Sequence, residues 1–558
     1  MRRQQFSSAR RRPASASSWF TPAGTAVLVA VLLAGSAGAA PRSPVILPQR
    51  PRQYVDTTLV APSEQTIAVP AGGDFQAALN SARPGDVIML EAGATFTGPF
   101  VLPYKTGSGW ITVRTSAPDR SLPPPGSRID PSYGPVLPKI VVGSRVGGAI
   151  QTAHAAHHFR FIGIEFTPVP GAFVYSLIDL GAREATPADL PSHIIIDRCY
   201  LHGDPRVGGR RGVAMNSVST AVIDSYLSEF KEVGADNQAI MGWNGAGPFK
   251  IVNNYLEAAG VNVFFGGGVP SIPNLVPSDI EVRGNYFTKK LSWRPGDRSY
   301  AGIPWAVKNL FELKNAARVL VDGNVFEHNW RGIFQPQDGF AVAFTPRNEA
   351  GGSPWSVVQD VTFTHNIIRH SSAGIQILGS DYNYPSQQLR RLLIQNNLFT
   401  DIGAYATHYN AGQLFLIVDG GADYVIDHNT AFHIEDPLYA QVHKASQWPA
   451  TGFVFTNNIV VNNAGVCGDY TGCNVLSTLT TYFPGYGFTH NVLVGGTAAT
   501  YPPNNFFPPS LAAVGFVNLA GGDYRLGKSS AYRRAGTDGQ DIGADLESLT
   551  DLLRQPSP

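Results

Sequence analysis

Ten short segments of this chain align so that one column holds a polar residue, most often asparagine, within a recurring apolar context. The gaps between neighbouring column positions range from 26 residues, between 199 and 225, to 42 residues, between 324 and 366. Repeats of this length indicate a solenoid, in which each unit buries its apolar face against its neighbours. The column consists of Cys199, Ser225, Asn254, Asn285, Asn324, Asn366, Asn397, Asn429, Asn458 and Asn491.

Each repeat has the pattern of short strands joined by turns. Residues 318–326, RVLVDGNVF, alternate apolar residues before a Gly-Asn corner, and this pattern is typical of a strand that ends in a turn. No repeat contains a ten-residue amphipathic pattern, which argues against helical repeats. An amide carries both a donor and an acceptor, so stacked Asn side chains can bond one another and the corner backbone. The sequence therefore predicts an all-β protein, a parallel β-helix whose coils stack along an asparagine ladder.

The repeats resemble those of right-handed parallel β-helix proteins of the pectate-lyase-like class. Residues 74–88 are similar to the N-terminal capping helix and first strand that open such solenoids, with Asp74 as the helix cap and Pro84-Gly85 ending the helix. Residues 523–526 and 535–544 resemble the closing segment of the class. The resemblance implies a right-handed solenoid over residues 71–500, followed by a C-terminal capping segment and tail over 501–558.

Residues 1–39 have the pattern of an export signal. Five arginines precede an apolar run from Thr25 to Ala34, and Ala37-Gly38-Ala39 is a small-residue cleavage site. The apolar run is short for a membrane span, although a retained anchor stays an alternative. We therefore expect a secreted, periplasmic or extracellular protein with no membrane association once the signal is removed. Residues 40–70 are rich in proline and read as a linker or an extended segment.

The charge balance limits the classes of partner that we expect, and the cysteines allow one disulfide. Without the signal the chain carries 37 basic and 41 acidic residues. With no basic stripe, a nucleic-acid partner is not expected. Cys467 and Cys473 either close a small disulfide loop or remain free thiols, and Cys199 in the ladder column is expected to be buried. The oligomeric state is not predicted.

One strand face collects candidate functional residues. If Phe311 and Leu313 point into the core, Glu312 and Lys314 point out on the same face, about 7 Å apart. Gln376 is expected on that face two coils further on. The repeats widen in this region, so long loops, which carry Arg347, Asp381 and Tyr382, rise beside these coils and favour a groove.

Residues 307–326 are similar to the active coil of polysaccharide lyases of the chondroitinase B and alginate lyase type. In those enzymes a lysine ends such a strand and acts as the base beside an arginine one coil later, and Lys314 matches that lysine. The arginine position falls near Gln337, with Arg331 and Arg347 as nearby substitutes. The metal-binding acids of the family fall near Val307 and Asn309, which cannot form a carboxylate cage, so calcium stays open with no ligand set identified.

The sequence thus suggests a polysaccharide lyase-like protein that performs β-elimination on an acidic, uronate-containing glycan. That chemistry needs a base and a positive charge beside the substrate carboxylate. The alternative is a non-catalytic β-helix that binds glycan or serves as a structural module, because this scaffold hosts both, and in that case Glu312 and Lys314 form a surface ion pair of little energetic value. The predicted catalytic residues are Lys314, Arg331 and Arg347, and the predicted substrate-binding residues are Glu312, Gln337, Gln376, Asp381 and Tyr382.

Overall fold

The computed structural model of this chain describes residues 45–144, 147–181, 183–333, 339–406, 411–444 and 448–553. The predicted export signal, residues 1–39, and Gln337 lie outside these ranges. Within them, every helix is too short or too polar to cross a membrane.

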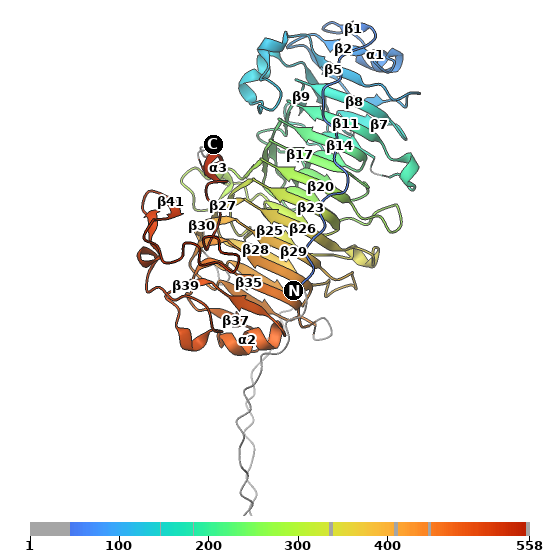
Figure 1. Cartoon of the computed structure of the whole chain (residues 1–558). Coiled ribbons are helices and arrows are strands. Elements are labelled where there is room, and N and C mark those ends of the chain that lie inside the picture. The colour runs from blue at the N-terminus through green and yellow to red at the C-terminus, as the bar shows by residue number, and fades with distance from the viewer. Residues whose placement is uncertain are drawn as a thin grey trace, which may run out of the picture. The chain divides into compact units, whose positions relative to one another are not determined.

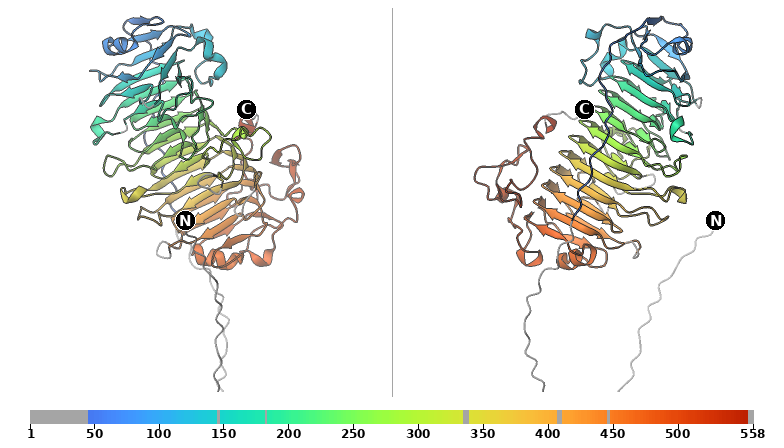
Figure 2. Two further views of the ribbon diagram at one scale, coloured as in Figure 1. Left: turned by 180° about the vertical axis from the view of Figure 1, so that it is seen from behind. Right: turned by 45° about the vertical axis from the view of Figure 1, so that its right-hand side comes forward.

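Three long parallel sheets wind around one core (Figures 1 and 2). Each strand pairs in parallel with its counterparts in the preceding and following coils, as β23 does with β20 and β26. The right-handed parallel β-helix predicted from the repeats is confirmed.

The strands of the described residues fall into the three sheets as follows. Sheet A contains β1 (Thr66–Val69), β2 (Val87–Leu90), β5 (Ile111–Thr115), β8 (His157–Ile162), β11 (Ser192–Asp197), β14 (Val218–Ile223), β17 (Phe249–Val252), β20 (Ser278–Arg283), β23 (Ala316–Asp322), β26 (Val358–Thr364), β29 (Arg390–Gln395), β32 (Ala422–Asp427), β35 (Thr451–Thr456) and β38 (Gly487–Thr489). Sheet B contains β3 (Thr95–Thr97), β6 (Lys139–Val142), β9 (Glu165–Pro168), β12 (Tyr200–His202), β15 (Tyr226–Phe230), β18 (Tyr255–Ala258), β21 (Tyr286–Thr288), β24 (Val325–Asn329), β27 (Ile367–Ser371), β30 (Leu398–Ile402), β33 (Thr430–His433), β36 (Ile459–Val461) and β39 (Val492–Val494). Sheet C contains β4 (Phe100–Leu102), β7 (Ile150–Thr152), β10 (Ile178–Leu180), β13 (Arg211–Met215), β16 (Gln238–Gly242), β19 (Val261–Phe265), β22 (Phe311–Leu313), β25 (Phe340–Phe344), β28 (Ala373–Leu378), β31 (Phe415–Val418), β34 (Leu438–Gln441) and β37 (Val466–Gly468).

The asparagine ladder lies at the corner between sheets A and B. Asn324 is representative: its Nδ2 donates to Asn366 Oδ1 (3.0 Å) and to Val282 O (3.0 Å), and its Oδ1 accepts from the backbone N and the Nδ2 of Asn285 (2.9 and 3.0 Å). The same pattern repeats from Asn254 to Asn491 and continues one step further, to Asn505. Because the amides from Asn254 to Asn491 are buried and paired, the ladder fixes the register of successive coils.

The residue before each ladder position explains the recurring Gly-Asn, Asn-Asn and His-Asn text. Gly323 (φ 66°), His365 (φ 52°) and Asn396 (φ 55°) all adopt the left-handed backbone conformation. Glycine and asparagine reach this conformation at the lowest steric cost. The corner therefore selects both residues of the motif, one for its backbone and the other for its amide.

Segments outside the three sheets cover parts of the solenoid. Helix α1 (Phe75–Ser81) begins at Asp74, whose side chain accepts from Ala77 N (2.9 Å), and buries Phe75 and Leu79. Near the other end, β40 (Phe516–Asn518) and β41 (Asp523–Leu526) pair antiparallel, and helix α3 (Thr550–Leu553) follows. Side chains of this C-terminal part pack on outward residues of sheet B, a cluster that includes Tyr255, Tyr286, Val325, Ile367, Leu398, Leu546 and Leu549.

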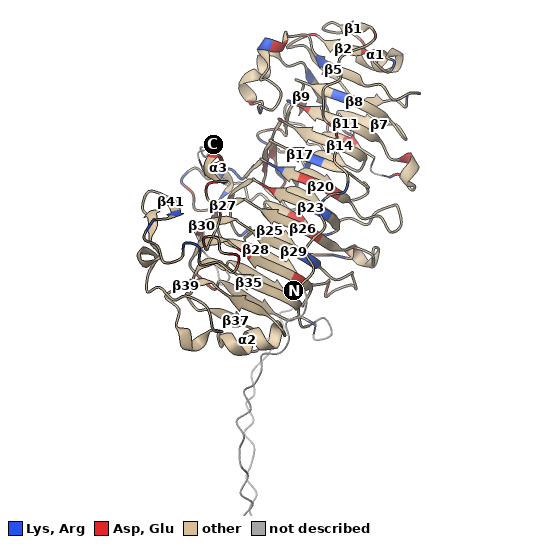
Figure 3. Ribbon diagram, in the orientation of Figure 1, with Lys and Arg blue, Asp and Glu red and all other residues tan. Residues whose placement is uncertain are grey.

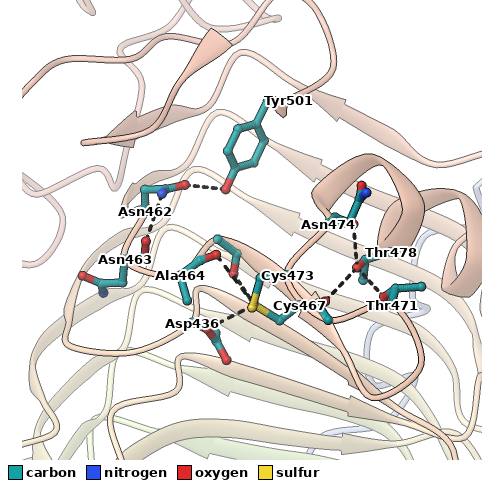
Figure 4. Close-up of a disulfide and its surroundings, with 12 residues drawn as sticks. Asp436, Asn462, Asn463, Ala464, Cys467, Thr471, Cys473, Asn474, Thr478 and Tyr501 are labelled. Atoms are coloured by element: carbon teal, nitrogen blue, oxygen red, sulfur yellow. Dashed lines mark hydrogen bonds between the residues drawn. A yellow bond between two sulfur atoms is a disulfide. The ribbon is translucent and has the colours of Figure 1, made fainter. Parts of the chain in front are cut away.

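Cys467 and Cys473 form a disulfide, the first of the two alternatives left by the sequence (Figure 4). The bridge closes the turn between β37 and helix α2 (Val475–Tyr482), and Asn474 caps that helix by accepting from Ser477 N (3.1 Å). Asp436 Oδ1 lies 3.4 Å from Cys467 Sγ, and burial raises the pKa of Asp436 to about 6. Cys199 is a buried free thiol, as predicted.

Candidate active site on sheet C

Strand β22 has the predicted alternation. Phe311 and Leu313 are fully buried in the central core, and Glu312 lies between them with its side chain on the opposite face. The strand register places Glu312 level with Phe264 on β19 and Ala343 on β25. One coil beyond Ala343, Gln376 occupies the same position on β28, two coils from Glu312 as predicted.

Glu312 lies between two lysines. Lys314 Nζ is 4.0 Å from Glu312 Oε1, and Lys308 Nζ is 3.7 Å from Glu312 Oε2. Lys308 also bonds Asp236 Oδ2 at 2.9 Å. Both ammonium groups lie over the Phe264 ring, at 5.2 Å for Lys314 and 5.9 Å for Lys308. We call Asp236, Phe264, Lys308, Glu312 and Lys314 the Glu312 cluster.

The Glu312 cluster is largely shielded from water. The Glu312 side chain is 6% exposed, and the Lys314 side chain 17%. Burial lowers the pKa of Lys308, but the carboxylates of Glu312 and Asp236 outweigh burial, so the net pKa lies above the ordinary lysine value. Glu312 Oε2 is buried and has no hydrogen-bond partner among the residues that the structure describes. A buried carboxylate oxygen without a donor is costly, which marks this atom as one that a ligand or water can satisfy.

Arg347 reaches the same edge of sheet C as Lys314. Its backbone N donates to Lys314 O (3.0 Å), and its guanidinium bonds Asp381 Oδ1 (2.9 Å) and lies 4.6 Å from the Tyr382 ring centroid. Tyr382 stacks in turn on His443 at 4.5 Å. Three predicted residues, from loops 345–357 and 379–389, therefore meet beside the end of β22.

Arg331 is placed differently. It follows β24 and precedes β25, so it lies at the edge where the sheet C strands begin, whereas Lys314 lies where they end. The structure thus separates the two arginines that the sequence offered as equivalents, and it brings Arg347 to Lys314. The prediction for Gln337 concerns a residue outside the described ranges.

The outer face of sheet C also carries polar, apolar and aromatic side chains on the earlier coils. In register with Glu312 and Phe264 lie Met241, Ala214 and Asp179 on β16, β13 and β10. Nearby, the Arg211 guanidinium lies 5.4 Å from the Trp243 ring centroid. Burial raises the pKa of Asp179. These residues form a line along the solenoid axis, in which Phe264, Met241 and Ala214 are buried.

Sequence reasoning missed Lys308 and Asp236. Lys308 is four residues before Glu312 in the sequence. Because Lys308 precedes the first residue of the strand, strand alternation does not predict the direction of its side chain. Asp236 lies 72 residues from Lys308 in the chain and carries no local signal. The sequence also did not identify Phe264 and Met241 as outward residues, because an apolar residue in a strand is compatible with either face.

The residues near β22 do not fit a calcium cage. Asn309 Nδ2 donates to Phe340 O (2.7 Å), and Val307 packs in a cluster with Trp293, Trp305 and Trp330. In the described part of the chain, the group of three metal-ligand side chains with donor atoms within 4.8 Å of one another is Asp436, Cys467 and Cys473. Its two cysteines are joined as the disulfide. Calcium prefers several carboxylate and carbonyl oxygens, which Glu312 alone does not supply.

Comparisons with known proteins return structures only. No protein-family profile and no curated protein matches the chain. A mutant form of the PL6 family alginate lyase AlyGC is similar with 13% identity and a TM-score of 0.42, over 86% of this chain and 58% of that chain. The catalytic unit of a GH87 α-1,3-glucanase from Streptomyces thermodiastaticus is similar with 12% identity and a TM-score of 0.45, over 80% of this chain and 73% of that one. Pectate lyase Pel9A is similar with 12% identity and a TM-score of 0.32, over 86% and 96%.

Proposed function

We propose that this protein binds an acidic polysaccharide along the outer face of sheet C and cleaves it by β-elimination at a uronate residue. The observation that carries the proposal is that Lys314 lies beside Glu312 at the end of β22, where the backbone of Arg347 bonds the Lys314 carbonyl. This reaction requires a base and a positive charge, and we assign these roles to Lys314 and Arg347.

In the proposed reaction Lys314, in its neutral form, takes the proton from carbon 5 of the uronate. The electron pair of the C5–H bond forms the C4–C5 double bond, and the bond from carbon 4 to the glycosidic oxygen breaks. That oxygen takes a proton from water, and the hydroxide left behind takes the proton from the Lys314 ammonium, which restores the neutral amine. Arg347 offsets the charge that spreads onto the substrate carboxylate, an effect that is strong in a shielded site. Glu312 holds Lys314 in position from 4.0 Å away.

A non-catalytic glycan-binding module is the second candidate, and one observation favours it. The charged groups on this face already have partners of opposite sign: Lys308 has Asp236 and Glu312, and Arg347 has Asp381. Networks of paired charges also occur where they only maintain structure. Such a module would bind the same ligand class without altering it.

Ultraviolet absorbance of unsaturated uronates distinguishes the two candidates. The purified protein is mixed with alginate, pectate, chondroitin and heparin-type chains, each with and without added calcium. We expect absorbance to rise with at least one of them. Retarded migration in gels that contain the glycan, without any rise in absorbance, would instead support the binding module.

We also propose that the protein is exported and that residues 1–39 are removed. The support is the sequence of residues 1–39, with its five arginines, apolar run and small-residue site.

We also propose that helix α1 caps the end of the solenoid. The support is that α1 buries Phe75 and Leu79 in the central core and that the Phe75 ring contacts that of Phe100 at 4.7 Å.

A further inference from the structure

The first described residues of the chain cross sheet A instead of joining it. This segment, residues 45–58, which we call the strap, runs from the later coils back to the earlier ones (Figures 1 and 2). Its backbone N–H groups bond side chains far away in the sequence: Ile46 N to Asp423 Oδ1 (3.2 Å), Gln49 N to Asp360 Oδ1 (3.0 Å) and Arg52 N to Asp279 Oδ1 (2.8 Å). The strap is therefore held by side-chain acceptors and not by a strand ladder.

The acceptors belong to a column of alternating charges along sheet A (Figure 3). On five successive strands, from β20 to β32, one position is occupied in turn by Asp279, Arg318, Asp360, Arg391 and Asp423. Arg318 Nε bonds Asp279 Oδ1 (2.7 Å), and Arg391 Nε bonds Asp360 Oδ1 (2.5 Å). The aspartates thus recur on every second strand, and Arg318 and Arg391 hold the carboxylates of Asp279 and Asp360.

The spacing of the strap matches the spacing of the aspartates. The donating residues are three apart, and a polyproline II chain advances about 9.3 Å in three residues. Two strands of a sheet span about 9.6 Å. Pro48 and Pro51, which immediately precede two of the donors, favour the extended conformation.

The same three-residue series continues beyond the aspartates. Val55 is 3% exposed and packs with Ile195, Ala221 and Ile223 on the outer side of sheet A. Thr58 O accepts from Arg160 Nη1 (3.2 Å). Five residues at regular intervals therefore contact sheet A from β32 back to β8, which a loosely tethered linker would not do.

Hydrogen bonds keep the acceptors charged. Burial raises the pKa of Asp279 and of Asp360, but donation from an arginine and from the strap outweighs burial, and both net pKa values lie below the ordinary aspartate value. A charged acceptor bonds an N–H more strongly than a neutral one does.

We propose that the column of Asp279, Arg318, Asp360, Arg391 and Asp423 is a binding site for an extended, proline-rich peptide with an N–H donor at every third residue. The strap is its resident ligand, a separable segment that binds once the coils from β8 to β32 are stacked. The site discriminates by the positions of the prolines, because a peptide shifted so that Pro48 and Pro51 take the places of Gln49 and Arg52 has no N–H donor there.

The test uses the complete chain, with a protease site inserted between Val60 and Ala61, where the residues are exposed. The folded protein is cut, and a fluorescent synthetic peptide of residues 45–60 is offered in competition with the cut strap. We expect the strap to remain bound after cutting and to exchange with the labelled peptide, as seen by fluorescence anisotropy. A second peptide, with one glycine inserted between Gln49 and Arg50, is expected to bind about tenfold more weakly, as is a scrambled peptide.

The Asp360→Asn substitution tests the same proposal by changing the binding site instead of the peptide. Asparagine accepts the left-handed backbone at this position (φ 57°), so the fold is preserved while the charge is lost. We expect about tenfold weaker peptide binding and no change for Asp119→Asn, whose side chain is 86% exposed and pairs with Arg114. Loss of the strap on cutting with no rebinding of the native peptide would overturn the proposal. Equal binding of the native and glycine-inserted peptides would overturn it as well.

Discussion

Asn324→Ala is expected to lower the free energy of unfolding by about 3 kcal/mol, from the cost of leaving buried polar groups without partners. The Asn324 amide is fully buried and makes four hydrogen bonds. Alanine removes the acceptor of the Asn285 backbone N–H and of its side-chain amide, and also the donor to Val282 O and Asn366 Oδ1.

The measurement is urea unfolding followed by circular dichroism, in wild type, Asn324→Ala and Asn383→Ala. Asn383 is an exposed loop residue, and the same substitution there is expected to change stability by less than about 0.5 kcal/mol. If the two variants unfold at the same urea concentration, the ladder does not hold the coils together in the manner described.

Lys314→Ala is expected to reduce the rate of β-elimination about a thousandfold, in the range found when a general base is removed. The Lys314 side chain borders the face of sheet C, so alanine leaves the core unchanged. Lys314→Arg sharpens the test because arginine keeps the positive charge but does not act as a base at neutral pH. We expect Lys314→Arg to bind the glycan and to remain inactive.

The matched control for both variants is Lys528→Ala, an exposed lysine of the C-terminal part, which is expected to retain the wild-type rate. Initial rates from the absorbance of unsaturated uronate give the comparison. Full activity in Lys314→Ala would remove Lys314 from the reaction. Activity in Lys314→Arg together with inactivity in Lys314→Ala would make this residue a binding cation and not the base.

The solenoid was predictable because one local rule repeats. The Gly323-Asn324 corner requires a left-handed residue followed by a buried amide, and the same two requirements recur at Asn396-Asn397 and at His365-Asn366. A constraint that acts on two adjacent residues produces a recurring residue pair, which can be recognised in a single sequence. Strand alternation is also a local rule, and in residues 311–314 it correctly predicted that Glu312 and Lys314 lie on the outer face.

The rest of the candidate site depends on contacts that leave no such trace. Lys308 and Asp236 each lie just before a strand of sheet C, two coils apart, and the paths of the segments before the strands are not periodic. Arg331 and Arg347 both follow Lys314 in the sequence, by 17 and 33 residues, yet the fold places them at opposite edges of sheet C. Similarly, residues 40–70 carried only a composition signal, and the partners of the strap are recognisable only once the coils of sheet A are stacked.

The most direct measurement is a crystal structure of the Lys314→Ala variant with the longest uronate oligosaccharide that the wild-type protein cleaves or binds. We expect a sugar chain lying along the outer face of sheet C, with one uronate carboxylate beside Arg347 and carbon 5 facing the place that the Lys314 side chain has left. An oligosaccharide bound over sheet B, or beside the C-terminal part of the chain with the Glu312 cluster uncontacted, would contradict it.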